Sequence, residues 1–211
     1  MSNAVPADLP RRPGPRPSTT PTNPHTQLDQ QPSDDQPRQR LIGQLSDLPG
    51  VVWTGSMISV PGAEALTLPR GTAQGPPDAF MIDTEFAHLH PAPDHSLHVV
   101  LPVTTAEAAI EAGWAELHPI ARRGIISPGA VMLYAPRDAA EADIAADLVR
   151  TSYAYATGTQ PPPRAEDQSR HTDSVRPQAR PRAAGLEVRT TAGSRASHER
   201  PRSAPHHTPA P

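Results

Sequence analysis

Proline most strongly limits where this chain can fold, because its 29 prolines are unevenly spread along 211 residues. Nine lie in residues 1–39 and nine in residues 159–211, and both segments contain few large apolar side chains. Such segments cannot bury enough apolar surface to offset the entropy lost on ordering. We therefore predict disordered arms at residues 1–39 and 159–211. Residues 40–158 remain as one folded domain of ordinary size.

Charge and cysteine content exclude several classes of function. The predicted domain holds 13 acidic residues against 6 arginines, which argues against nucleic-acid binding on its folded surface. The nine arginines of the C-terminal arm are mixed with five acids and have no aromatic neighbour to stack on bases, so we expect no specific nucleic-acid binding there either. The absence of cysteine excludes disulfides, zinc thiolates and thiol nucleophiles. No stretch approaches 18 apolar residues and no signal peptide is evident, so a cytoplasmic protein without membrane association is expected.

The apolar pattern of the domain predicts three helices and several strands. Helical spacing covers residues 38–48, and two further helices begin with capping boxes near Thr104 and Asp138. Strands are predicted near residues 51–54, 66–68, 79–82 and 130–134, with a hairpin over residues 85–101. This order predicts an α+β domain, an antiparallel sheet with helices on one face.

The hairpin can be given a register from its alternating apolar residues. Leu89 and Leu97 share the core face only if they lie opposite each other, since cross-strand neighbours share a face. That register places His88 opposite His98, and His90 opposite Ser96. The three histidines then project from the face away from the aliphatic core, with Phe86 and Val100 beside them.

The histidines and their neighbours are the candidates for chemistry. His88, His90 and His98 could bind zinc, iron or copper, could act as general acids and bases, or could be polar residues of a solvated sheet face. His118, before Pro119, is a fourth candidate. Arg137 could hold a carboxylate, phenolate or enolate, or could pair with an acid of the next helix. No phosphate loop or dinucleotide fingerprint is present, so no organic cofactor is expected.

Four sequence blocks together resemble one known family. The blocks are residues 86–90, 96–98, 113–119 and 133–137, and they occur in the same order as in the domain family that contains the luciferase of bioluminescent fungi. The resemblance spans about residues 80–157. It implies oxidation of a hydroxylated pyrone by molecular oxygen without a bound organic cofactor. Luminescence is not expected of this chain.

The resemblance and the residues together predict a cofactor-free, oxygenase-like enzyme acting on an enolic or phenolic small molecule. Such a reaction needs a base for the hydroxyl proton and a donor for the resulting anion. We expect His88, His90, His98 and His118 to supply the base and its orienting groups, and Tyr134 and Arg137 to stabilise the anion. Two alternatives remain open: a ligand-binding or interaction domain that is not an enzyme, and a metal enzyme with histidine ligands.

Overall fold

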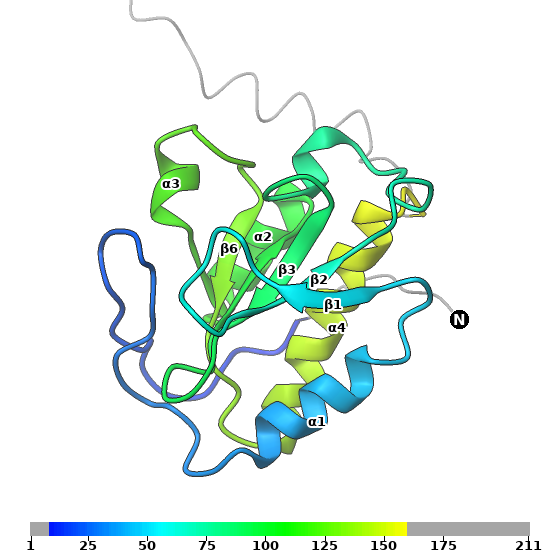
Figure 1. Cartoon of the computed structure of the whole chain (residues 1–211). Helices are drawn as coiled ribbons and strands as arrows, with labels where there is room; N and C mark the ends of the chain where they lie inside the picture. Colours follow the sequence, from blue (N-terminus) through cyan, green and yellow to red (C-terminus); the bar gives the residue numbers. More distant parts are fainter. Residues whose placement is uncertain (1–8, 160–211) are drawn as a thin grey trace, which may run out of the picture.

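The computed structural model describes residues 9–159, which form an open antiparallel sheet with helices against it (Figure 1). The strands are β1 Val52–Gly55, β2 Glu64–Thr67, β3 Glu85–Leu89, β4 Leu97–Val100, β5 Ala115–Leu117 and β6 Ala130–Leu133. The helices are α1 Gln36–Leu45, α2 Val103–Glu111, α3 Pro119–Arg122 and α4 Ala139–Ala156, with a 3-10 turn at Pro77–Ala79. The sheet order is β1-β2-β3-β4-β6-β5. The predicted α+β class is confirmed.

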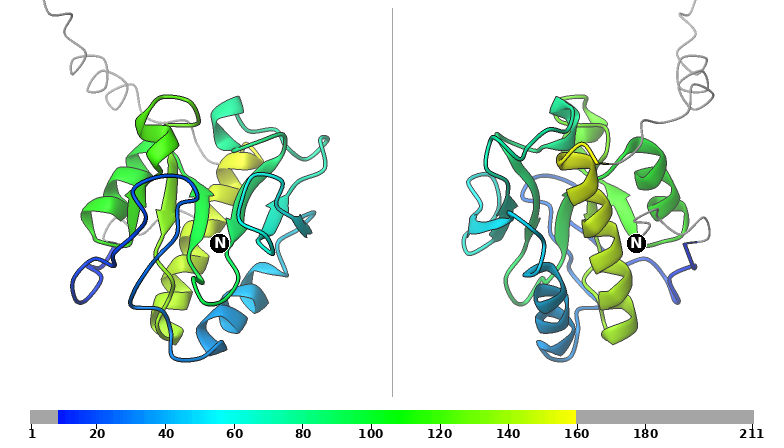
Figure 2. Two further views of the ribbon diagram at one scale, coloured as in Figure 1. Left: turned by 60° about the vertical axis from the view of Figure 1, so that its left-hand side comes forward. Right: turned by 90° about the vertical axis from the view of Figure 1, so that its right-hand side faces the viewer.

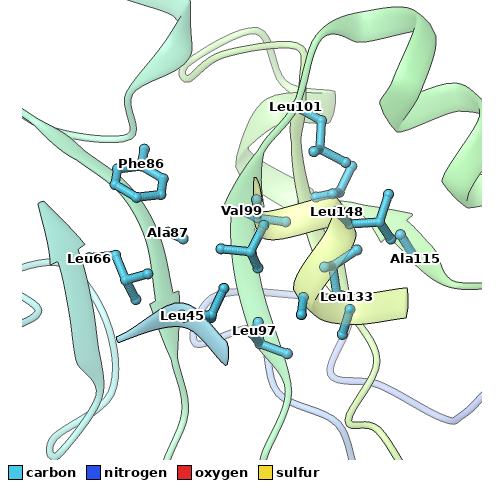
Figure 3. Packing of buried hydrophobic residues seen from close by; sticks show 14 of the residues in the cluster. Leu45, Leu66, Phe86, Ala87, Leu97, Val99, Leu101, Ala115, Leu133 and Leu148 are labelled. Carbon is cyan, nitrogen blue, oxygen red and sulfur yellow. The ribbon is translucent and has the colours of Figure 1, made fainter. Parts of the chain in front are cut away.

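The core lies between the sheet and the helices α1, α2 and α4. Leu66, Ala87, Leu97, Val99 and Leu133 point from the strands toward Leu45 of α1 and Leu148 of α4, and all are almost completely buried (Figure 3). A cluster of this size is the main source of stability for a domain of this length. None of the helices in residues 9–159 has the length and apolar character needed to cross a bilayer.

The predicted hairpin register is confirmed. Strands β3 and β4 pair His88 with His98 and Leu89 with Leu97, and the His90 amide donates to the Ser96 carbonyl at 2.9 Å. The aliphatic residues face the helices, and the histidines occupy the opposite face. Alternation of side chains along a strand therefore determined the position of the candidate site.

A β-bulge displaces Phe86 from the face on which it was predicted. Leu66 pairs with Ala87 but Thr67 pairs with Glu85, so β3 carries one extra residue at this point. Phe86 consequently joins Ala87 on the helix side, where its ring lies 6.1 Å from the ring of Tyr153. Glu85 consequently faces the histidines.

Several local predictions differ from the structure. Residues 79–82 form no strand, because Pro77 begins a 3-10 turn and only Ile82 makes an isolated bridge. Helix α2 begins one residue before the predicted Thr104 cap, after Pro102, so the expected capping box does not cap it. The Asp138 cap is confirmed, since its side chain accepts from the Glu141 amide. Strand β5 and the short helix α3 were not predicted.

Residues 9–39 are not a separate disordered arm, contrary to the prediction for residues 1–39. The Arg12 guanidinium is buried over the rings of Trp114 and Tyr134, and Trp114 Nε1 donates to the Pro10 carbonyl. Arg12 also pairs with Glu141. Composition failed here because the segment is held by polar contacts and one buried arginine, not by large apolar side chains. The predicted tail, residues 159–211, lies outside the described residues except for Thr159.

Residues 12–35 run along the sheet before entering α1, and the left view of Figure 2 shows this blue segment in front of the strands. Gln27 attaches this segment to the domain at two points. Its side-chain oxygen accepts from the Ala135 backbone amide at 2.8 Å, and its backbone amide donates to the Asp94 carboxylate at 3.0 Å. We call residues 12–35 the N-terminal strap. It lies on the histidine face of the sheet and brings His25 to that face.

Candidate functional site

Five buried histidines meet on the face of the sheet opposite the main core. His88 lies in β3, His90 directly follows that strand, and His98 lies opposite in β4. His118 follows β5, and His25 comes from the N-terminal strap. The ring centroids of His98 lie 4.6 to 5.3 Å from those of the other four. All four histidines predicted from the sequence therefore converge around His98.

These rings line a pocket of about 450 Å³, within the range of small-molecule sites. Its base is formed by the imidazoles and its walls by apolar side chains from separate loops. The walls comprise Ile58, Val60 and Pro61, Met81 and Ile82, and Ile120 and Ile126. An apolar wall around a few convergent polar groups is typical of a site for a small organic ligand.

A chain of hydrogen bonds orients His98. His88 Nδ1 lies 2.7 Å from Glu85 Oε1, and His88 Nε2 lies 2.9 Å from His98 Nδ1. Because a carboxylate accepts, His88 donates from Nδ1 and must accept at Nε2 from His98 Nδ1. His98 Nε2 therefore carries a lone pair. It is buried, lies at the pocket, and has no hydrogen-bond partner among the described residues.

His90 is oriented by a second carboxylate. Its Nδ1 bonds to Asp94 Oδ2 at 2.5 Å, so in the neutral imidazole Nε2 is also an unpartnered acceptor at the pocket. Asp94 Oδ1 accepts from the Gln27 amide of the strap and from the Ser96 amide. Burial opposes ionisation of Asp94, but the hydrogen bonds from His90, Ser96 and Gln27 outweigh it and lower its pKa.

His118 presents a donor instead. Its Nδ1 accepts from the Ile120 amide at 3.1 Å and caps the short helix α3. A neutral imidazole that accepts at Nδ1 carries its proton on Nε2. His118 therefore offers an N–H where His98 and His90 offer lone pairs, and the pocket can both accept a proton and donate a hydrogen bond.

Burial keeps the central rings neutral. It lowers the pKa of His98 well below its ordinary value, and repulsion from His88 and His90 adds to the effect. Burial also lowers the pKa of His88, against the opposing hydrogen bond to Glu85. The pKa of His118 falls to about 4, again mainly through burial. A neutral imidazole at neutral pH is the form that can accept a proton.

We expect acid to destabilise the fold through these histidines. The pKa of His118 is about 4 in the folded state, whereas an ordinary histidine, as in the unfolded chain, has a pKa of 6.5. Between these pH values only the unfolded chain binds the proton. Stability is full above pH 6.5 and falls as the pH drops, by about 1.4 kcal/mol per pH unit for each such histidine. Thermal melts at pH 7.5 and 5.5 measure the effect. His118→Asn, which keeps a cap for α3, should show a shallower pH dependence; an equally steep one would contradict this prediction.

Tyr134 and Arg137, the two predicted anion stabilisers, do not line the pocket. Arg137 pairs with Glu141 and donates to the Pro13 carbonyl at 2.8 Å, so the alternative of an ion pair with the next helix describes it. The Tyr134 hydroxyl donates to Glu116 at 3.2 Å. Burial raises the pKa of Tyr134 to about 12, and repulsion from Glu116 adds to it. Arg137 thus holds Pro13 of the N-terminal strap, and Tyr134 holds Glu116.

Four supporting residues were not predicted: His25, Glu85, Asp94 and Glu116. Glu85 required the bulge, which apolar alternation cannot reveal, and His25 lies in a segment that composition assigned to an arm. Asp94 could have been found, since Pro91-Ala92-Pro93-Asp94 places it in the hairpin turn close to His90. Glu116 alternates with Ala115 and Leu117 on β5, which puts it on the histidine face.

Two histidine trios could hold a metal ion within residues 9–159: His88, His90 and His98, and His25, His98 and His118, with ligand atoms within 4.8 Å of one another. In the first trio, both ring nitrogens of His88 already make hydrogen bonds. In the second, the Ile120 amide leaves His118 Nε2 protonated. A metal ion at either trio must displace a hydrogen bond, because a ligating imidazole needs a free lone pair.

Part of the chain is similar to known proteins. A family model described as the luciferase domain matches residues 83–152. The resemblance expected from the sequence is confirmed. The segment is 35% identical over 75 residues to the luciferase of Neonothopanus nambi and 31% identical to those of Armillaria mellea and Armillaria gallica. The match covers 35% of this chain, and the chain spans only 28% of the length of each of these luciferases. No solved structure matches the chain.

The luciferase-like segment contains four of the five pocket histidines and the carboxylates Glu85, Asp94 and Glu116. His25 lies outside it, as do the pocket walls at Ile58 and Met81. The centre of the site thus lies in the segment that resembles the fungal luciferases, whereas His25 and part of the pocket wall come from other parts of the chain.

Proposed function

We propose that the pocket is the active site of an oxygenase-like enzyme that acts on an enolic or phenolic small molecule. One observation carries the proposal: the Glu85–His88–His98 chain ends in an unpartnered, buried nitrogen at an apolar pocket. A lone pair held in one orientation by a carboxylate behind it is the arrangement expected of a general base. The similarity of residues 83–152 to fungal luciferases supports oxidation as the reaction class.

In this proposal His98 Nε2 removes the hydroxyl proton and His118 Nε2–H donates to the resulting oxyanion. The electron-rich anion then reduces dioxygen: one electron transfers, and the two radicals combine to form a carbon–oxygen bond. The peroxide anion takes the proton back from His98. Both oxygen atoms remain with the organic products, the substrate is oxidised, and no external reductant is consumed. The negative anion and Glu85 stabilise the imidazolium that forms at His98.

Oxygen consumption tests the proposal. The full chain is mixed with 4-hydroxy-6-methyl-2-pyrone, an enol, or 2,6-dimethoxyphenol under ¹⁸O-labelled dioxygen. We expect oxygen uptake without a reductant and both labelled atoms in the organic products. Saturable binding without turnover would favour the alternative of a ligand-binding domain. Activity that is lost on dialysis against a chelator, and restored by a divalent metal, would favour the metal enzyme.

A further inference from the structure

His25 has an unpartnered nitrogen that the proposed proton transfer does not use. Its side chain is 1% exposed, and its ring stacks on His98 with centroids 5.3 Å apart and planes 16° apart. Its Nε2 bonds to Glu116 Oε1 at 2.5 Å, so in the neutral imidazole Nε2 carries the proton and Nδ1 carries a lone pair. Nδ1 is buried and has no partner among the described residues. A buried acceptor left unpaired is costly unless a ligand or water satisfies it.

Several hydrogen bonds hold His25 in its position. Thr20 closes the turn that carries it, because its hydroxyl donates to the Pro24 carbonyl at 2.7 Å and accepts from the Thr26 amide at 2.9 Å. Gln27 then attaches the strap to Ala135 and Asp94. Glu116 retains a lowered pKa despite burial, because His25 and Tyr134 hydrogen-bond to it. The carboxylate therefore fixes the tautomer of His25.

The unpaired hydrogen-bonding groups of the pocket indicate how many donors a matching ligand should carry. The pocket presents unpartnered acceptors at His25 Nδ1, His90 Nε2 and His98 Nε2, and a donor at His118 Nε2. A ligand with a single hydroxyl supplies one proton donor for these acceptors. His25 and His98 belong to one trio in which one ring nitrogen of each histidine lies within 4.8 Å of the others, and both line the same pocket, so one ligand can contact both rings.

We propose that the N-terminal strap is part of the site and that His25 accepts a hydrogen bond from a second donor, a hydroxyl or amino group close to the reactive hydroxyl of the ligand. This inference rests on the proposed function for the choice of reactive hydroxyl. His25 is then a specificity-determining residue contributed from outside the luciferase-like segment. A site built to hydrogen-bond a second donor discriminates against a ligand that lacks it.

Matched probes test this proposal by calorimetric titration of the full chain. 2-Amino-4-nitrophenol is compared with 2-methyl-4-nitrophenol, and 3-amino-4-nitrophenol with 3-methyl-4-nitrophenol, since amino and methyl groups have similar size but only the amino group donates. We expect at least one amino probe to bind roughly tenfold more tightly than its methyl partner, the value of one additional hydrogen bond. His25→Phe, which keeps a ring to stack on His98, should abolish the difference.

Each result decides the proposal. Equal binding of amino and methyl probes to the native chain overturns it, and so does an amino preference that persists in His25→Phe or an absence of binding by every probe. The comparison on the native chain stands even if His25→Phe does not fold, which a thermal melt reports. Calorimetry detects binding whether or not the phenol ionises. Failure of the proposed proton abstraction, seen as absence of oxygen uptake, is therefore separate from failure of the His25 contact.

Discussion

Replacing His98 by Gln is expected to lower oxygen consumption by about 10²–10⁴-fold, the usual contribution of a positioned base. The Gln side chain can still donate to His88 Nε2, so the hydrogen bonds between Glu85, His88 and residue 98 are kept. Its amide group, however, cannot accept the substrate proton. The fold should remain nearly intact, because His98 Nε2 has no partner to lose among the described residues. Initial rates of oxygen uptake and a thermal melt on the same preparation measure both effects.

Met132→Leu provides the control for packing. Met132 lies directly opposite His98 on β6 and is fully buried, and a Met-to-Leu change approximately conserves volume. This variant should keep most of its activity. If His98 is instead structural, His98→Gln should cost roughly 1–3 kcal/mol of unfolding free energy and leave turnover of the folded fraction unchanged. That pair of results would remove His98 from the mechanism.

Replacing Glu141 by Ala is expected to lower the unfolding free energy by about 3–5 kcal/mol, since it leaves a buried charge unpaired. Glu141 Oε2 lies 3.0 Å from Arg12, and Glu141 also accepts from the amide and guanidinium of Arg137. The side chains of Arg12 and Glu141 are 2% and 5% exposed, so water cannot replace the carboxylate. Chemical denaturation of the full chain measures the loss.

The same change should weaken the site at a distance. Arg12 attaches the start of the N-terminal strap to Ala112 and Ala135, so its release loosens the strap, which carries His25. Glu107→Ala is the matched control, an exposed glutamate of helix α2, and should change stability by less than about 0.5 kcal/mol. A Glu141→Ala variant as stable as this control would show that the Arg12 pair does not hold the segment.

The centre of the site followed from the sequence because alternation along a strand is a local rule. Leu89 and Leu97 determined the register, and the register placed His88 opposite His98. His118 required only that the chain return to the same face. These residues also lie in the segment that resembles the luciferase family.

The residues that surround the site could not be predicted from the sequence, because most of them depend on contacts between distant parts of the chain. A single bulged residue moved Phe86 to the core and turned Glu85 toward His88, and no local pattern marks that residue. The strap has the composition of a disordered segment, yet Arg12, His25 and Gln27 each form a hydrogen bond with a residue far along the chain. Arg137, by contrast, forms the local pair with an acid of the next helix that the sequence offered as its alternative role, since Glu141 lies only four residues further on.

Absorbance of bound 4-nitrophenol tests the central claim most directly, because the phenol and its anion have separate absorption bands. The titration is done at a pH below the pKa of the free probe, where the free compound is mostly protonated. Proton transfer to His98, with His118 donating to the oxyanion, predicts that binding to the native chain increases the phenolate band and that binding to His98→Gln does not. A probe that binds the native chain as the neutral phenol would contradict the account.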